Sequence, residues 1–249
     1  MGFWVILPII LCSVSFVGCW TVYGLALRFN HVCSLSNWEY RNSCHTNETG
    51  MCCTLDNVPT ISTSGANFPE NSLFTATINA GSFLFLIFCI FHHAHILDQS
   101  SMHSLLSKIA LVLGCVASMG AFMAGNCNPV ELLLLHYLGA ALSFVCVCLY
   151  ITILTSLTSK CMLTGCEWLL YPLRILSATI QISATILYCI FFIQEDSFYK
   201  HISAVFEWML SLNLELYELS YVVEFYFFSS SMLSALLAKK EEEKPLILT

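Results

Sequence analysis

The fold is decided by residues 132–158, which read LLLLHYLGAALSFVCVCLYITILTSLT. This stretch contains no Asp, Glu, Lys or Arg. A helix needs about 20 apolar residues to cross the roughly 30 Å hydrocarbon core of a bilayer. The stretch is long enough, and it lacks the alternation of polar and apolar residues that is typical of a membrane β-barrel strand. It therefore predicts a transmembrane helix.

The rest of the chain has the same character. Its 249 residues are 57% hydrophobic and 10% charged, with a mean hydropathy of +0.77. A soluble domain usually carries about 25% charged residues, so this composition fits lipid rather than water as the solvent. Apolar stretches predict five further helices, at residues 3–27, 72–96, 105–125, 172–193 and 202–236. We expect an all-α, polytopic membrane protein, with a six-helix transmembrane bundle in residues 1–236 and a cytoplasmic tail in residues 237–249.

The long connection between the first two predicted helices, residues 28–71, carries signals of an outer compartment. Asn47 begins an Asn-Glu-Thr acceptor site for N-glycosylation. The segment also holds four cysteines, Cys33, Cys44, Cys52 and Cys53. Glycosylation and disulfide formation both take place on the lumenal or extracellular side of a membrane. We therefore expect an extracellular loop and two cytoplasmic termini.

Four loop cysteines allow three pairings. A bond between the adjacent Cys52 and Cys53 would be strained, which leaves two pairings open. One joins Cys33 to Cys52 and Cys44 to Cys53. The other joins Cys33 to Cys53 and Cys44 to Cys52. Either pairing would staple the loop into a compact cap.

The basic residues agree with this orientation. Six fall on the predicted cytoplasmic side and three on the outer side, which is the direction of the positive-inside rule. The cytoplasmic group is Lys108, Lys160, Arg174, Lys239, Lys240 and Lys244. The outer group is Arg28, Arg41 and Lys200.

Carboxylates fall inside the sixth predicted helix, where each costs on the order of 2.5–3.5 kcal/mol on insertion scales. On a helix that turns 100° per residue, Glu207, Glu215 and Glu218 lie within about 80° of one another, and Glu224 lies nearly opposite. The three form an acidic stripe that faces something polar. Glu207 also lies near the outer surface, where water would solvate it.

Two interpretations of the acidic stripe are open. One is an ion or proton path. The other, which we favour, is a set of carboxyl groups that are protonated or hydrogen bonded to neighbours such as Asn79, His136 or Gln181. A second polar group, His92, His93, His95 and His103, gathers at the inner end of the second predicted helix. A polar border at the membrane surface explains these histidines better than a zinc site does.

The tail carries Glu242, followed four positions later by Leu246 and Ile247. This pattern resembles an acidic dileucine sorting signal, which clathrin adaptor complexes bind as an acid and two aliphatic side chains on a flexible strand. Such a signal would let the protein cycle from the plasma membrane to endosomes and lysosomes. The alternative is a solvated, charged chain end.

Landmarks along the chain match a known family. In the first third they are Trp20-Thr21-Val22-Tyr23, His31-Val32-Cys33, Asn37-Trp38, Ser43-Cys44 and Cys52-Cys53-Thr54-Leu55-Asp56. Further along they are Pro69-Glu70, Asn79, Gly125-Asn126, His136-Tyr137, Gly139-Ala140, Glu207-Trp208 and Glu224-Phe225. Over residues 1–228 the chain resembles the transmembrane protein 150 family, most of all its A-type members, within the Frag/DRAM/Sfk superfamily of autophagy and phosphoinositide modulators.

The resemblance implies a non-enzymatic membrane regulator. It would control recruitment of phosphatidylinositol 4-kinase, whose complex subunits would be partners, and so the synthesis of phosphatidylinositol 4-phosphate at the plasma membrane. Superfamily relatives modulate autophagy at lysosomal or endosomal membranes, which is one alternative function. An ion channel or transporter that uses the acidic stripe is another. The sequence shows no basic stripe for nucleic acid and no phosphate-binding or zinc-protease motif, so we expect neither catalysis nor a cofactor.

Overall fold

The computed structural model describes residues 2–44, 52–161 and 163–228. Within them the chain forms helices and no strands, and the predicted all-α membrane fold is confirmed. The six long helices are α1 (Ile6–Arg28), α3 (Glu70–Gln99), α4 (Ser104–Asn126), α5 (Leu133–Cys161), α6 (Glu167–Phe192) and α7 (Ser197–Leu219). The short elements are η1 (Phe3–Val5), η2 (Leu55–Asn57), α2 (Ile61–Ser64), η3 (Ser101–His103) and α8 (Val222–Tyr226).

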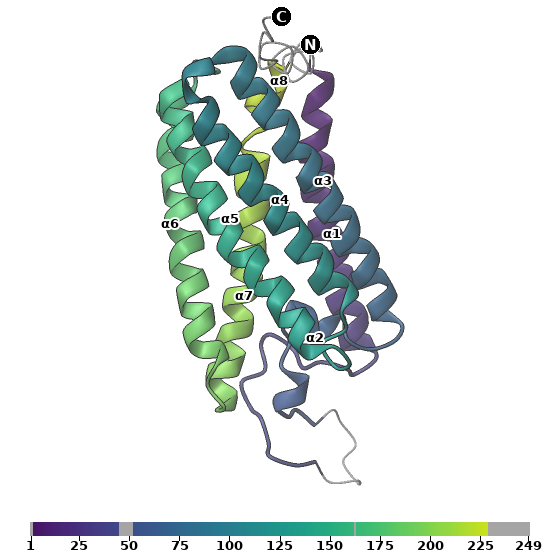
Figure 1. Ribbon diagram of the computed structural model, residues 1–249. Coiled ribbons are helices and arrows are strands. Elements are labelled where there is room, and N and C mark those ends of the chain that lie inside the picture. The colour runs from purple at the N-terminus through teal and green to yellow at the C-terminus, as the bar shows by residue number, and fades with distance from the viewer. Residues whose placement is uncertain (1, 45–51, 162, 229–249) are drawn as a thin grey trace, which may run out of the picture.

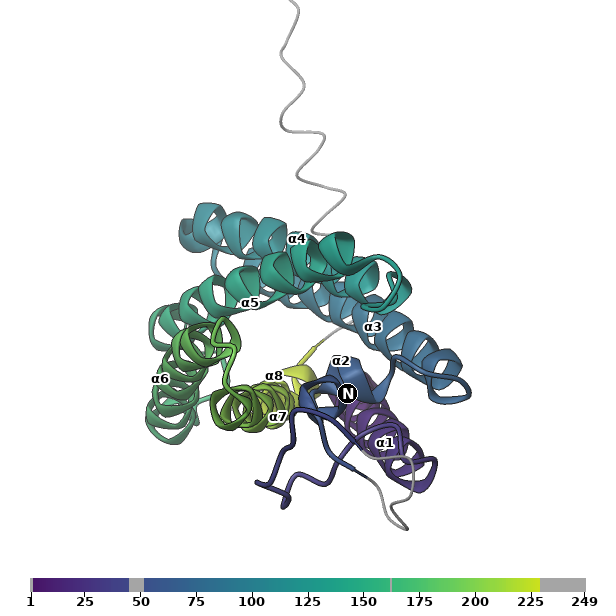
Figure 2. The ribbon, with the colours of Figure 1, turned by 90° about the horizontal axis from the view of Figure 1, so that it is seen from below.

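The six long helices run alternately up and down and close into a ring (Figures 1 and 2). Each packs against the next in the order α1, α3, α4, α5, α6 and α7, and α7 returns to α1. We call the end that carries the connection between α1 and α3 the loop end. The opposite end, where α1 begins and α8 lies, is the terminal end (Figure 1).

The sixth helix differs from the other five. The helix from Phe3 to Arg28, together with α3 to α6, has the length and apolar composition of a membrane span, whereas the more polar α7 is not among the helices that do. It nevertheless lies in the ring between α6 and α1. The prediction of one helix over residues 202–236 is corrected, because α7 ends at Leu219 and the short helix α8 ends at Tyr226. Residues 229–236 lie outside the described part of the chain.

Aromatic side chains fill the ring toward the terminal end. Phe88 of α3 stacks on Phe225 of α8 with ring centroids 5.1 Å apart, and it meets the ring of Tyr221 edge-on at 5.5 Å. Phe85 packs in the same cluster against Tyr150 of α5 at 5.4 Å. Buried aromatic pairs of this kind add about 0.5–1.5 kcal/mol beyond the burial of their area. This half of the bundle is therefore a packed core.

Two glycines let α4 and α5 approach closely. A Cβ atom added to Gly139 would lie 2.6 Å from the carbonyl oxygen of Gly120, and one added to Gly120 would lie 2.7 Å from the carbonyl oxygen of Gly139. Small residues at helix contacts allow such backbone approach in membranes, where packing rather than the hydrophobic effect holds helices together. The pair fixes the wall formed by α4 and α5.

The structure joins Cys33 to Cys53 and Cys44 to Cys52, which is the second of the two open pairings. The first bond holds the start of the loop against the segment that leads into η2. The predicted glycosylation site, Asn47, lies outside the described residues.

The loop is fastened to α7. Tyr40 contacts Nδ1 of His201 through its hydroxyl group at 2.6 Å, and Nε2 of His201 donates to the carbonyl oxygen of Leu35 at 3.0 Å. The indole N–H of Trp208 donates to the carbonyl oxygen of Pro59 at 2.9 Å. The loop is therefore part of the folded body, and it lies over the α1 and α7 side of the loop end (Figure 2).

Candidate functional site

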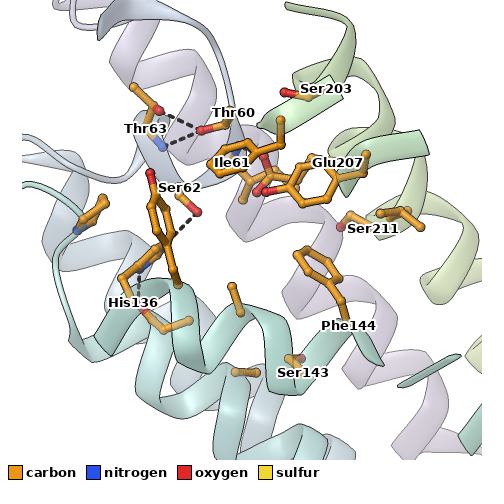
Figure 3. Close-up of a pocket in the computed structure, with 18 of the residues that line it drawn as sticks. Thr60, Ile61, Ser62, Thr63, His136, Ser143, Phe144, Ser203, Glu207 and Ser211 are labelled. Atoms are coloured by element: carbon orange, nitrogen blue, oxygen red, sulfur yellow. Dashed lines mark hydrogen bonds between the residues drawn. The ribbon is translucent and has the colours of Figure 1, made fainter. Parts of the chain in front are cut away.

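A cavity of about 710 Å³ lies inside the ring, beneath the loop (Figure 3). The short helix α2 and its flanking residues border it at the loop end, and side chains of all six long helices form its walls. Cavities of about 300–1,000 Å³ are typical of small-molecule sites. This cavity is therefore large enough to bind a small molecule, and we take it as the candidate functional site.

The polar end of this cavity is built around Glu207 of α7, whose side chain is only 5% exposed. The backbone N–H of Ile61, at the start of α2, donates to Oε2 of Glu207 at 3.3 Å. Thr60 caps α2 by accepting from the N–H of Thr63 at 2.9 Å, which fixes this turn beside the carboxyl group. The expectation that water solvates Glu207 is corrected, because the docked loop covers it.

His136 of α5 forms the second part of the polar end (Figure 3). Its Nδ1 lies 2.9 Å from the carbonyl oxygens of both Ala124 and Cys127, and its Nε2 lies 2.9 Å from the hydroxyl oxygen of Ser62. Carbonyl oxygens only accept, so Nδ1 carries a proton. Ser62 also borders Glu207 and so bridges the histidine and the carboxyl group.

A smaller cavity of about 160 Å³ adjoins the first one and reaches deeper into the bundle. Ser143, Val147, Ser211 and Leu214 line both cavities, whereas Glu215 and Glu218 line the smaller one alone. Ser211 donates to Oε1 of Glu215 at 3.2 Å. The three carboxyl groups of the acidic stripe thus face the interior of the ring, over about 16 Å of α7.

The other predicted intramembrane polar residues pair elsewhere. Asn79 and Asn126 exchange side-chain hydrogen bonds of 3.2 and 2.7 Å near the loop end of α3 and α4. Gln181 accepts from Asn213 at 2.7 Å. The partners suggested for the acidic stripe are therefore corrected, because Asn79, His136 and Gln181 are each bonded to other groups.

Glu224, on the opposite side of the acidic stripe, has a buried basic partner. Arg174 of α6 is 0% exposed, and its Nη1 lies 2.5 Å from Oε1 of Glu224. The same guanidinium group donates to the Thr158 hydroxyl at 2.7 Å, to the Ser220 hydroxyl at 3.0 Å and to the Ser220 carbonyl oxygen at 3.1 Å. It also lies 3.5 Å from the centre of the Tyr221 ring. Arg174 therefore donates a hydrogen bond to the carbonyl oxygen of Ser220, which has no helical partner because α7 ends there.

Sequence reasoning missed this ion pair because it counted Arg174 among the cytoplasmic residues. The signal was present, since the predicted helix at 172–193 already contained Arg174, and an arginine within a span usually has an acidic partner.

The predicted position of the histidines at the membrane surface is also corrected. His92, His93 and His95 are buried, with His92 bonded to Glu224 at 3.2 Å and His93 to Ser107 at 2.7 Å. They are part of the core and not a border at the surface.

Among residues 2–44, 52–161 and 163–228, no group of three or more His, Cys, Asp or Glu side chains is arranged to hold a metal ion. The sorting motif at Glu242, Leu246 and Ile247 lies outside the described residues.

These features define a class of protein: a multi-pass helical membrane protein whose ring of six helices encloses a cavity under a disulfide-bonded loop. Residues 3–228 match the Frag1/DRAM/Sfk1/Cwh43P N-terminal domain family, and this range covers the whole ring, the loop and α8. The chain belongs to that family and, within it, to the transmembrane protein 150 group.

Individual relatives cover most of the chain. It is 33% identical to human transmembrane protein 150A over 230 residues, which is 90% of this chain and 84% of the relative. It is 32% identical to the Xenopus laevis protein of the same name over 227 residues, which is 89% of this chain and 83% of the relative. The Xenopus laevis modulator of macroautophagy TMEM150B-A is 27% identical over 226 residues, which is 91% of this chain and 88% of the relative. No solved structure matches the chain.

Proposed function

We propose that this chain is a non-enzymatic regulator that controls recruitment of phosphatidylinositol 4-kinase, and so phosphatidylinositol 4-phosphate synthesis, at the plasma membrane. The observation that carries the proposal is the continuous match to transmembrane protein 150A through the loop and the six helices. In this reading both termini lie in the cytoplasm, and the loop lies outside. The cytoplasmic tail, residues 237–249, lets the protein cycle to endosomes and lysosomes through clathrin adaptor complexes.

The terminal end would carry the contact surface for the kinase complex. Two large apolar side chains project there, Met102 at the turn between α3 and α4 and Trp168 at the start of α6, with exposures of 85% and 78%. Both lie in or next to short connections that face the cytoplasm in the proposed orientation. Exposed aromatic and Met side chains are enriched at protein interfaces.

Proximity labelling tests this proposal. A biotin ligase fused to the tail should label subunits of the phosphatidylinositol 4-kinase complex in cells, and a phosphatidylinositol 4-phosphate reporter should leave the plasma membrane when the protein is depleted. Met102→Glu together with Trp168→Glu should reduce the labelling several-fold. Val130→Glu, an equally exposed site at the loop end, is the matched control. Unchanged kinase labelling in the double variant, or none in the wild type, contradicts the proposal.

A second candidate is modulation of autophagy, because several relatives are named modulators of macroautophagy at 27–28% identity. It predicts that depletion changes autophagic flux and that Leu246→Ala with Ile247→Ala moves the protein from lysosomes to the plasma membrane. Normal flux after depletion counts against it.

A third candidate is a channel or transporter, because Glu207, Glu215 and Glu218 line the cavities. The packed aromatic core between these cavities and the terminal end opposes it. Because this core closes the path, we expect purified protein in liposomes to pass no ions. A flux that falls in Glu215→Gln and Glu218→Gln would instead support transport.

A further inference from the structure

The walls of the larger cavity are mainly hydrocarbon. Its apolar lining includes Phe74, Ile78, Phe144, Leu210 and Leu214. A molecule that fills such a space gains free energy by burying hydrocarbon, at roughly 25 cal/mol per Å² of apolar surface. The body of the ligand is therefore apolar.

The polar end of the cavity selects among apolar molecules. Glu207 offers carboxyl oxygens, and Ser62 and His136 stand beside it. Two more acidic side chains, Asp56 and Glu195, line the same cavity toward the loop. An anionic headgroup would be repelled by this excess of acid, whereas a hydroxyl group can donate to a carboxyl oxygen.

Lys200 is the basic side chain that lines the cavity, and it is already engaged. Its Nζ donates to the carbonyl oxygen of Phe192 at 2.5 Å and lies 4.3 Å from the centre of the Phe192 ring. It would have to break these contacts to bind a phosphate. Lys200 therefore does not offset the acidic side chains, and the site disfavours an anionic ligand.

The position of the cavity matches one leaflet. Its lining on α7 extends from Lys200 to Leu214, or about 20 Å along the helix. This is roughly half of the 40–45 Å thickness of a bilayer with its headgroups. Tyr137 of α5 lines the cavity and is 43% exposed, so the cavity lining there is not closed off by further layers of protein. A lipid in the surrounding leaflet is therefore the nearest source of a ligand.

We propose that this cavity binds a neutral membrane lipid whose polar end is a hydroxyl group, with that hydroxyl at Glu207 and the hydrocarbon body along α7 toward Leu214. Sterols and diacylglycerols share this chemistry. The inference does not depend on the proposed kinase or autophagy role, because it concerns only the contents of the cavity.

Photolabelling of the full-length protein tests the proposal. Purified protein in phosphatidylcholine vesicles is irradiated with a photoreactive sterol, a photoreactive diacylglycerol or, as the control, a photoreactive phosphatidylcholine. At least one hydroxylated probe should label peptides that contain Ile78, Phe144 or Leu214, and the same unlabelled lipid should compete. The probe that labels identifies the source. Labelling by phosphatidylcholine alone, or equal labelling by all probes, overturns the proposal.

Variants separate the polar end from the body of the site. Glu207→Leu removes the acceptor and should weaken labelling by up to about tenfold, the typical weight of one hydrogen bond. Glu207→Gln keeps an acceptor and should retain most of the labelling. Ser143→Phe fills the cavity without altering Glu207 and should abolish labelling, whereas Val145→Phe, two residues away and 55% exposed, should not. Equal labelling of Ser143→Phe and Val145→Phe overturns the proposal even if Glu207→Leu fails to fold.

Discussion

Arg174 of α6 and Glu224 of α8 form an ion pair whose side chains are both almost completely buried. Burial of a charge within a membrane protein is tolerated when every polar partner is satisfied. Arg174 meets this condition through Thr158 and Ser220, and Glu224 meets it through His92. One charged pair therefore ties α3, α5 and α6 to the end of α7 and to α8.

Removal of one partner should destabilise the bundle strongly. Arg174→Met leaves a buried carboxylate without its cation, which typically costs about 3–5 kcal/mol. The double variant Arg174→Met with Glu224→Met removes both charges and should recover most of the loss. Thermal unfolding in detergent, followed by size-exclusion chromatography, measures both effects. Lys108→Met, an exposed lysine at the same end, is the control, and an equal loss there would contradict the explanation.

The glycine contact between α4 and α5 predicts a sharp size limit. Gly139→Ala places a methyl group against the Gly120 carbonyl oxygen and the Ala124 backbone nitrogen, neither of which can move without shifting a helix. Overpacking of this kind costs about 1–3 kcal/mol, so the melting temperature should fall. An added methyl group at Gly24 of α1 meets nothing within 4 Å. Gly24→Ala should therefore be neutral or stabilising by up to about 1 kcal/mol.

The disulfide pairing can be read directly. A non-reducing digest should yield peptides linked between Cys33 and Cys53 and between Cys44 and Cys52. The closed segments have sequence separations of 20 and 8 residues. The chain-entropy estimate then gives losses of about 3 and about 2.5 kcal/mol when each bond is replaced by a serine pair.

The matched control for these serine pairs is Cys127→Ser. Cys127 is a free cysteine next to the loop end of α4, and its replacement should leave stability unchanged. Cys52 and Cys53 are adjacent and stay on one peptide, so the pairing is read from fragment ions that separate them, and a fragment that joins Cys33 to Cys52 would show that the other pairing forms.

The contact between Tyr40 and His201 should hold the loop on α7. Nε2 of His201 donates to Leu35, so Nδ1 of the neutral ring accepts from the Tyr40 hydroxyl group. Tyr40→Phe removes this hydrogen bond, at a cost of about 1 kcal/mol, and should speed amide hydrogen exchange in residues 31–44. Tyr199→Phe, on the exposed side of α7, should not change that exchange.

The same contact gives a pH dependence. Burial raises the pKa of Tyr40 from 10.0 to about 12, with a smaller contribution from Tyr23. A raised pKa in the folded state means that the neutral hydroxyl form is favoured, so its stabilising effect is complete below pH 10 and is lost as pH rises through 12. Loop exchange should therefore accelerate over this range in the wild type. If Tyr40→Phe shows the same acceleration, another group is responsible.

Sequence reasoning succeeds where the signal is local. The apolar run at 132–158 and the cysteines of the loop each reveal a helix or a cross-link without knowledge of distant residues. The end of α7 was not predictable in this way, because the residues after Ser220 are as apolar as those of a continuing helix. It depends on Arg174, whose guanidinium group binds the Ser220 carbonyl oxygen from another helix.

The candidate cavity shows the same limit. The helical spacing of Glu207, Glu215 and Glu218 places them on one face of α7, and in the structure all three face the interior. Their surroundings could not be derived from that spacing, because the backbone N–H of Ile61 and the hydroxyl group of Ser62 come from a loop about 145 residues earlier. Contacts between distant segments require the fold.

The polarity of α7 bears on how the protein is made. The helices that precede α7 are apolar enough to leave the translocon for lipid one at a time. In α7 three buried glutamates make insertion into lipid as a single helix unfavourable. Its place beside α1 exists only after the first helix, synthesised long before, is already in the membrane. A ribosome that stops before α7 would release a product with an open seam between α6 and α1, and such a product is a natural substrate for membrane quality control.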